Sequence, residues 1–171
     1  MKTLLLGMGN PILCDDAVGV RLAQDFKEKL NHVPDLDVIG ECSVGGLNLL
    51  DVFSGYDRVI VLDSFKTTDG IPGDWYAFTA RALCETVHLT NIHDTNFATA
   101  LKLGHSMGMT LPHIEDIHIF GVEIRENRLF SERMTTELEE SYPRYASGIF
   151  KAVQALLQTP LGRIDDKRER A

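Results

Sequence analysis

Hydrophobic residues follow two patterns along the chain: short continuous apolar runs, and longer stretches in which they recur every three or four positions. A short apolar run is typical of a buried strand, whereas recurrence at the helical period is typical of an amphipathic helix. The pattern predicts strands at 3–6, 37–41, 58–62, 75–78 and 115–122. It predicts helices at 16–30, 46–53, 97–104 and 135–157, and Pro143 either kinks the last helix or begins it. Residues 81–91 show no clear period.

The first twenty residues, MKTLLLGMGNPILCDDAVGV, indicate how these elements are arranged. The apolar run Leu4–Leu6 ends in a turn containing Gly7 and Gly9, and the first predicted helix follows. A strand, a glycine turn and a helix in this order are typical of the start of an α/β domain. In open α/β sheets the ligand site lies beyond the carboxyl ends of the strands. We therefore expect the functional groups of this chain at that edge.

Three candidate groups fall at predicted junctions of this kind. Asp16 follows the glycine turn, Asp63 follows the most apolar predicted strand, and His93 precedes a helix. Two carboxylates and an imidazole suit a borderline divalent metal such as nickel or zinc. Each group also has a purely structural alternative, because Asp15 or Asp16 can cap the first helix, Asp63 can cap a loop, and a lone histidine commonly packs in a core.

Length and charge narrow the classes of protein that fit. The chain has 171 residues, which predicts one domain over 1–158 followed by a charged, frayed tail at 159–171. The net charge of −8 argues against a nucleic-acid partner, which needs a basic face. No apolar run approaches the roughly 20 residues of a membrane span. The run Leu4–Leu6 is too short for a signal peptide, so we expect a cytoplasmic protein.

Other chemistries have weaker support in the sequence. Cys14, Cys42 and Cys84 form no CxxC pair, so we interpret them as inert thiols, and the neighbouring aspartates should raise the pKa of Cys14. A dinucleotide fingerprint needs a third glycine where Ile12 stands. Ser64 has no Ser-His-Asp order around it. An enzyme without a side-chain nucleophile would use metal-bound or carboxylate-activated water.

The segment GMGNPILCDDAVGV resembles the N-terminal signature of the hydrogenase maturation endopeptidases, roughly G-x-G-N-x-x-x-x-D-[DE]-x-x-G. Later motifs follow in the order of that family. They are a glycine-rich turn at 43–46, a strand ending in aspartate (VIVLDSF) and a histidine before a helix (IHDTNF). The resemblance spans about residues 1–157.

This resemblance implies a three-layer α/β sandwich of the phosphorylase/hydrolase-like kind, with a twisted, mostly parallel five-stranded sheet flanked by helices. It implies a protease that removes the C-terminal extension of a nickel–iron hydrogenase large-subunit precursor after nickel insertion. By position, Asp16 matches the family's acidic ligand, which is glutamate in some members, Asp63 the second carboxylate and His93 the imidazole. These three residues would then be both the metal ligands and the catalytic residues. The precursor would supply the nickel, and zinc or cadmium could also occupy the site.

Two other functions stay open from the sequence. One is an α/β module that binds a nucleotide or another small ligand through the glycine turn. The other is a nickel-binding accessory protein without catalytic activity. Nucleotide affinity would identify the first, and a cleavage assay would separate the second from the protease.

Overall fold

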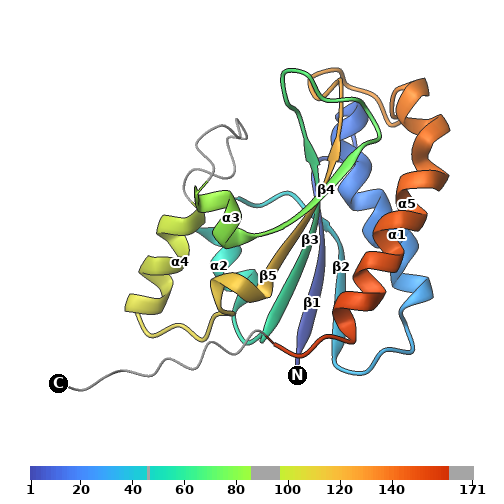
Figure 1. Cartoon of the computed structure of the whole chain (residues 1–171). Helices are drawn as coiled ribbons and strands as arrows, with labels where there is room; N and C mark the ends of the chain where they lie inside the picture. Colours follow the sequence, from blue (N-terminus) through green and yellow to red (C-terminus); the bar gives the residue numbers. More distant parts are fainter. Residues whose placement is uncertain (46, 86–96, 162–171) are drawn as a thin grey trace.

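A five-stranded β-sheet forms the centre of the computed structural model, which describes residues 1–45, 47–85 and 97–161 (Figure 1). Its strands are β1 (Thr3–Met8), β2 (Leu36–Cys42), β3 (Arg58–Phe65), β4 (Trp75–Thr79) and β5 (Ile117–Glu123). They lie in the order β2-β1-β3-β5-β4, with β4 antiparallel to β5 and the other three pairs parallel. The predicted mostly parallel five-stranded sheet is therefore confirmed.

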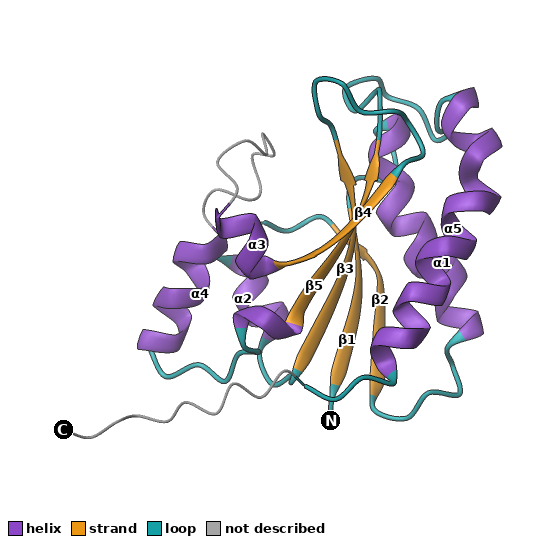
Figure 2. Ribbon diagram, in the orientation of Figure 1, coloured by secondary structure: helices purple, strands orange, loops and turns teal. Residues whose placement is uncertain are grey.

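Helices cover both faces of this sheet (Figure 2). One face carries α1 (Val18–Lys29), which follows the 3-10 turn η1 (Cys14–Ala17), and α5 (Thr136–Leu157). The other face carries α2 (Asn48–Phe53), α3 (Ala80–Glu85) and α4 (Phe97–Ser106), and the 3-10 turn η2 (Ile114–Asp116) leads into β5. The three layers that the resemblance implies are thus present.

Alternate residues of the central strands divide between two apolar cores. In β3, Ile60 and Leu62 pack against α1 and α5, whereas Val59 and Val61 pack in the core beneath α2 and α4. A parallel strand that is buried on both faces has a continuous apolar sequence. This burial explains why β1 and β3 give the clearest strand signals in the sequence.

The close approach of α1 to the sheet depends on Gly19. A Cβ at this position would lie 2.3 Å from the carbonyl oxygens of both Met8 and Leu62, a distance that no side chain tolerates. Glycine therefore lets the first turn of α1 rest directly on β1 and β3. This contact fixes η1 beside the carboxyl end of β3.

Several boundaries differ from the prediction, and two of these differences change the setting of candidate site residues. β3 continues through Asp63 to Phe65, because its last residues pair with β5. α1 begins at Val18, because the preceding residues, Asp16 among them, form the tighter turn η1. Helix α3 forms at 80–85, where the sequence shows no period.

The C-terminal part of the chain settles one alternative. Helix α5 begins at Thr136, so Pro143 lies inside it and the interpretation in which Pro143 begins the helix is wrong. The single domain over 1–158 stays a prediction, and the predicted frayed tail falls mostly on 162–171, outside the described residues. Within the described part of the chain, no helix is both long enough and apolar enough to cross a membrane.

Candidate active site

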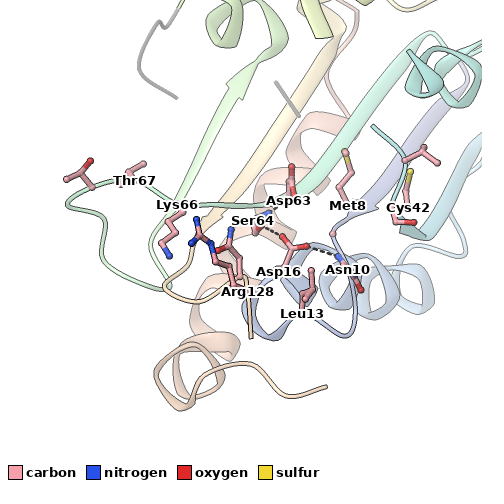
Figure 3. Close-up of a pocket in the computed structure, with 15 residues that line it drawn as sticks. Met8, Asn10, Leu13, Asp16, Cys42, Asp63, Ser64, Lys66, Thr67 and Arg128 are labelled. Atoms are coloured by element: carbon pink, nitrogen blue, oxygen red, sulfur yellow. Dashed lines mark hydrogen bonds between the residues drawn. The ribbon is translucent and has the colours of Figure 1, made fainter. Parts of the chain in front are cut away.

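Loops that follow β1, β2, β3 and β5 surround a pocket of about 670 Å³ at the carboxyl edge of the sheet (Figure 3). This is the edge at which the sequence predicts the functional groups. The polar and charged side chains that matter for chemistry are Asp16, Asp63, Ser64, Lys66 and Arg128. The pocket thus combines two carboxylates with two cations.

The carboxylate of Asp16, which lies in η1, is held at both of its oxygens. Oδ2 accepts a hydrogen bond from the backbone amide of Asn10 at 2.8 Å, and Oδ1 accepts one from the hydroxyl of Ser64 at 2.7 Å. The turn that places Asn10 here requires glycine at position 9, because Gly9 has a φ of +130° and a Cβ would lie 2.0 Å from the carbonyl oxygen of Asp16. Asp16 is half-buried and has a defined orientation toward the pocket.

Asp63 lines the same pocket from the end of β3. Its Oδ1 accepts a hydrogen bond from the backbone amide of Ser64 at 2.7 Å. Because successive residues of a strand point to opposite faces, the hydroxyl of Ser64 reaches η1 while the Asp63 side chain faces the layer of α2 and α4. The structure therefore brings Asp16 and Asp63 into one pocket and links them through Ser64.

The sequence does not predict a role for Ser64 in this site, because Ser64 is considered only as a nucleophile and no Ser-His-Asp order surrounds it. The side chain is 5% exposed and bonded to Asp16, which is typical of a residue that orients another. Its position in the sequence could have indicated this role. A hydroxyl residue directly after a strand-end aspartate points to the face of the sheet opposite to that aspartate.

His93, the third predicted ligand, lies outside the described residues, and its place in the site stays a prediction. Among the residues that the structure describes, no group of three or more His, Cys, Asp or Glu side chains could hold a metal ion. Zinc sites in proteins take three or four protein ligands. Asp16 and Asp63 therefore fit a divalent metal only as part of a set, which needs a further ligand from this chain or from a partner.

Asp15 does not cap the first helix, and that alternative is wrong. Neither η1 nor α1 has a side-chain cap, and the fully buried Asp15 carboxylate turns instead to the loop between β5 and α5. It accepts hydrogen bonds from the backbone amides of Arg125, Glu126 and Thr135 at 3.3, 3.0 and 2.7 Å. It also accepts one from the hydroxyl of Thr135 at 3.2 Å. Asp15 thus fastens one wall of the pocket to the turn that carries Asp16.

The loop between β3 and β4, residues 66–74, forms another wall and closes on the buried residue Glu123. The carboxylate of Glu123 accepts hydrogen bonds from the amide of Thr67 at 2.6 Å and from its hydroxyl at 3.1 Å. The backbone of Glu123 accepts from the amide of Gly73 at 2.9 Å and donates to the carbonyl of Asp74 at 2.8 Å. Both ends of the loop therefore meet on one residue.

The two described thiols are poor nucleophiles. Burial raises the pKa of Cys14, and the charge of Asp15 raises it further, in the direction that the sequence predicts. Burial also raises the pKa of Cys42, which lines the pocket, and the charge of Asp63 adds to this effect. Since the thiolate is the reactive form, both shifts suppress reactivity. The side chain of Cys84 lies outside the described part of the structure.

The glycine turn is poorly suited to a nucleotide phosphate. A phosphate binds at such a turn through backbone amides at a helix start. Here the backbone amide of Asn10 already donates a hydrogen bond to the Asp16 carboxylate. A phosphate would meet like charge from Asp16, which disfavours the nucleotide-binding alternative.

The fold and the pocket define an α/β protein with paired carboxylates at the carboxyl edge of a mostly parallel sheet. The sequence profile described as hydrogenase maturation protease (HycI) matches residues 20–152. The chain belongs to the hydrogenase maturation protease family. The matched range contains Asp63 and His93 and begins after Asp16.

Individual relatives agree with this membership. The chain is 32% identical over 73 residues to the hydrogenase 2 maturation protease of Escherichia coli (strain K12), a match that covers 43% of this chain and 44% of that relative. The match thus spans less than half of the relative's length.

Among solved structures, the hydrogenase maturating endopeptidase HybD from E. coli is similar with a TM-score of 0.67 and 20% identity, over 91% of this chain and 93% of that one. The [NiFe] hydrogenase maturation protease HybD from Thermococcus kodakarensis is similar with a TM-score of 0.64 and 19% identity, over 89% and 99%. At these identities the two likenesses show the shared fold.

Proposed function

We propose that this chain is an endopeptidase that removes the C-terminal extension from the large-subunit precursor of a nickel–iron hydrogenase after nickel has been inserted. Membership of the maturation protease family supports the class of reaction. The observation that carries the proposal is the pair of carboxylates, Asp16 and Asp63, joined through Ser64 in one pocket.

In this proposal the nickel belongs to the substrate. Asp16 and Asp63 would each offer a carboxylate to it, and His93 would offer an imidazole nitrogen. Asp16 and Asp63 line one pocket, and a metal that arrives with the precursor also brings ligands from it, so this chain would supply only part of its coordination. When bound, such a metal can polarise a nearby carbonyl oxygen.

Residues of this chain would orient the Asp16 carboxylate and supply a general base for the attacking water. Ser64 and Asn10 hold the Asp16 carboxylate in one position, so one of the two pocket carboxylates can accept a proton from an attacking water. A covalent route through Ser64 is disfavoured, because its side chain is 5% exposed and its hydroxyl is bonded to Asp16. The raised pKa values of Cys14 and Cys42 disfavour a thiol route in the same way.

The test compares nickel-loaded and nickel-free precursor at equal concentration, with the mass of the large subunit as the readout. We expect a loss of mass from the nickel-loaded precursor alone. Equal cleavage of both forms would overturn nickel recognition and leave the protease assignment standing. Binding of the nickel-loaded precursor without any loss of mass would instead establish the non-catalytic accessory protein. Loading with zinc or cadmium tests whether the site accepts other divalent metals.

A further inference from the structure

Just over half of the exposed large apolar side chains of the described residues lie on the loops that also carry pocket residues. Of the eleven that are exposed among the described residues, six lie on the loops after β1, β2, β3 and β5, which are Ile12, Val44, Leu47, Ile71, Leu129 and Phe130. Single exposed apolar residues are normal on a protein surface, but a group that surrounds a polar site marks an interaction surface. Phe130 is 78% exposed and Leu129 61%, so water covers most of both side chains in the free chain.

A tight turn presents these two side chains. The Glu126 side chain accepts hydrogen bonds from the backbone amides of Arg128 at 2.7 Å and Leu129 at 3.1 Å. These two amides are the main cause of the lowered pKa of Glu126, to which the charge of Lys66 also contributes. The turn therefore holds its shape through a charged acceptor, and Leu129 and Phe130 project from a fixed support.

The residues after this turn are also fixed to the segment that precedes η1. The amide of Ser131 donates to the carbonyl of Ile12 at 3.0 Å, and the amide of Cys14 donates to the carbonyl of Ser131 at 2.9 Å. A parallel bridge between Leu13 and Ser131 places Ile12 next to Phe130 across the pair. Ile12 and Phe130 thus lie side by side, and Leu129 precedes Phe130 in the chain; these three residues are here called the apolar rim. It adjoins the pocket directly, because Leu13 lines the pocket.

The chemistry of the surroundings indicates what covers the apolar rim. A small ligand would fill the pocket and leave Phe130 in water. A nucleic acid is disfavoured by the net charge of −8. Arg128 stands between the rim and the pocket, is exposed, and forms no salt bridge with another described residue, so it offers a charge to a carboxylate of the partner. A protein whose chain enters the pocket brings its folded surface close to this rim, because the rim adjoins the pocket-lining residues Leu13 and Arg128.

We propose that the apolar rim is the docking surface for the folded body of the protein substrate, and that Arg128 pairs with a carboxylate beside the apolar patch of that substrate. This inference rests on the proposed function, because the substrate is the hydrogenase large-subunit precursor. The rim supplies affinity through buried apolar area, while the carboxylates in the pocket act on the segment to be cut. Because the turn is already ordered, little conformational entropy is lost on docking.

The experiment replaces rim residues with charged ones and measures cleavage of nickel-loaded precursor. Phe130→Asp and Leu129→Asp should each raise KM about tenfold or more, as expected for a central apolar contact, and should leave kcat within about twofold. Arg128→Glu should raise KM and weaken its dependence on salt. Binding of nickel-free precursor, measured separately, should weaken by a similar factor in Phe130→Asp.

Met107→Asp is the matched control, because Met107 is 70% exposed and lies on the described segment between α4 and η2, which lines no part of the pocket. It should keep the wild-type KM. Thermal unfolding of every variant checks the fold, which exposed positions should preserve. An unchanged KM in Phe130→Asp, with active wild type, would overturn the docking surface and leave the protease proposal standing.

Two other outcomes separate the proposals. Precursor binding that depends on Phe130, without cleavage by the wild type, would support the docking surface and overturn the protease. A wild-type dimer in sedimentation that Phe130→Asp dissociates would assign the rim to a second copy of the chain, and so overturn the proposed occupant.

Discussion

The hydroxyl of Ser64 donates a 2.7 Å hydrogen bond to Asp16, a residue 48 positions earlier in the chain. The backbone amide of the same serine donates a bond of equal length to Asp63. One buried residue at the end of β3 therefore fixes the position of one carboxylate relative to the other. In metal sites, loss of a group that orients a ligand typically costs about 10- to 100-fold in affinity or activity.

Asp16→Asn and Asp63→Asn should each abolish cleavage of the nickel-loaded precursor while the fold is retained. An amide cannot accept a proton from water as a carboxylate does, and it is a weaker metal ligand. On the sequence prediction alone, His93→Ala should do the same. The measurement is the mass of the large subunit, with circular dichroism to check the fold. Asp51→Asn, at an exposed position of α2, is the control, and near-normal cleavage by one of the site variants would remove that residue from the site.

Ser64→Ala should lower kcat about 10- to 100-fold, the range typical for loss of an orienting partner, with a smaller change in KM. The variant leaves one oxygen of Asp16 without its donor, so the free energy of unfolding should fall by about 1–2 kcal/mol. Steady-state kinetics and urea unfolding measure the two effects. The exposed Ser54→Ala is a suitable comparison. Wild-type kcat in Ser64→Ala would show that the bond to Asp16 is irrelevant to the reaction.

Asp15→Asn should destabilise the chain by about 3 kcal/mol, well above the roughly 1 kcal/mol expected for loss of a helix cap. The carboxylate is fully buried and accepts four hydrogen bonds from Arg125, Glu126 and Thr135, and an amide would place its own N–H groups against some of those donors. For a chain of this size the fall in Tm is about 6–12 °C. Asp51→Asn serves again as the control for thermal unfolding. A loss below 1 kcal/mol would mean that the β5–α5 loop does not depend on Asp15.

Stability should fall as the pH drops below about 6.5, and His118 should account for part of the fall. Burial and then the charge of nearby Arg58 lower the pKa of His118, only partly opposed by Asp116 and Glu115. The unfolded chain therefore binds a proton at a higher pH than the folded chain, so protonation favours unfolding. Urea unfolding at pH 7.5 and 5.5 should show a smaller difference for His118→Gln than for the wild type. His32→Gln, in an exposed loop, is the control, and equal differences in both variants would contradict this role.

Much of the fold could be predicted because the central strands are buried on both faces and therefore have apolar sequences. The same topology predicts that Asp16 and Asp63 meet, since the carboxyl ends of parallel strands share one edge, and both side chains line one pocket. Their chemical roles, and that of His93, stay predictions.

Contacts between distant segments could not be predicted in this way. Asp15 looks like a helix cap in its local sequence, but its partners lie 110 to 120 residues later in a loop without periodicity. The sequence predicts that β3 ends at Leu62, which would place Ser64 in a loop. Ser64 has a fixed orientation because β3 continues to pair with β5 beyond Leu62. Apolar residues such as Phe130 look like core residues until the position of their loop is known.

The anchoring of loop 66–74 on Glu123 determines which part of this loop can vary in length within the family. Because Thr67 and Gly73 are both anchored on that one residue, the part of the loop beyond Thr68 can change length while the pocket-lining residues 66–68 keep their positions. Doubling the length of a flexible loop costs only about 0.6 kcal/mol of closure entropy. Gly70 marks the limit of this freedom, since a Cβ there would lie 2.0 Å from the Glu123 carboxyl carbon. A lineage of this family could therefore acquire new substrates by insertion at one tip while the carboxylates of the pocket keep their positions.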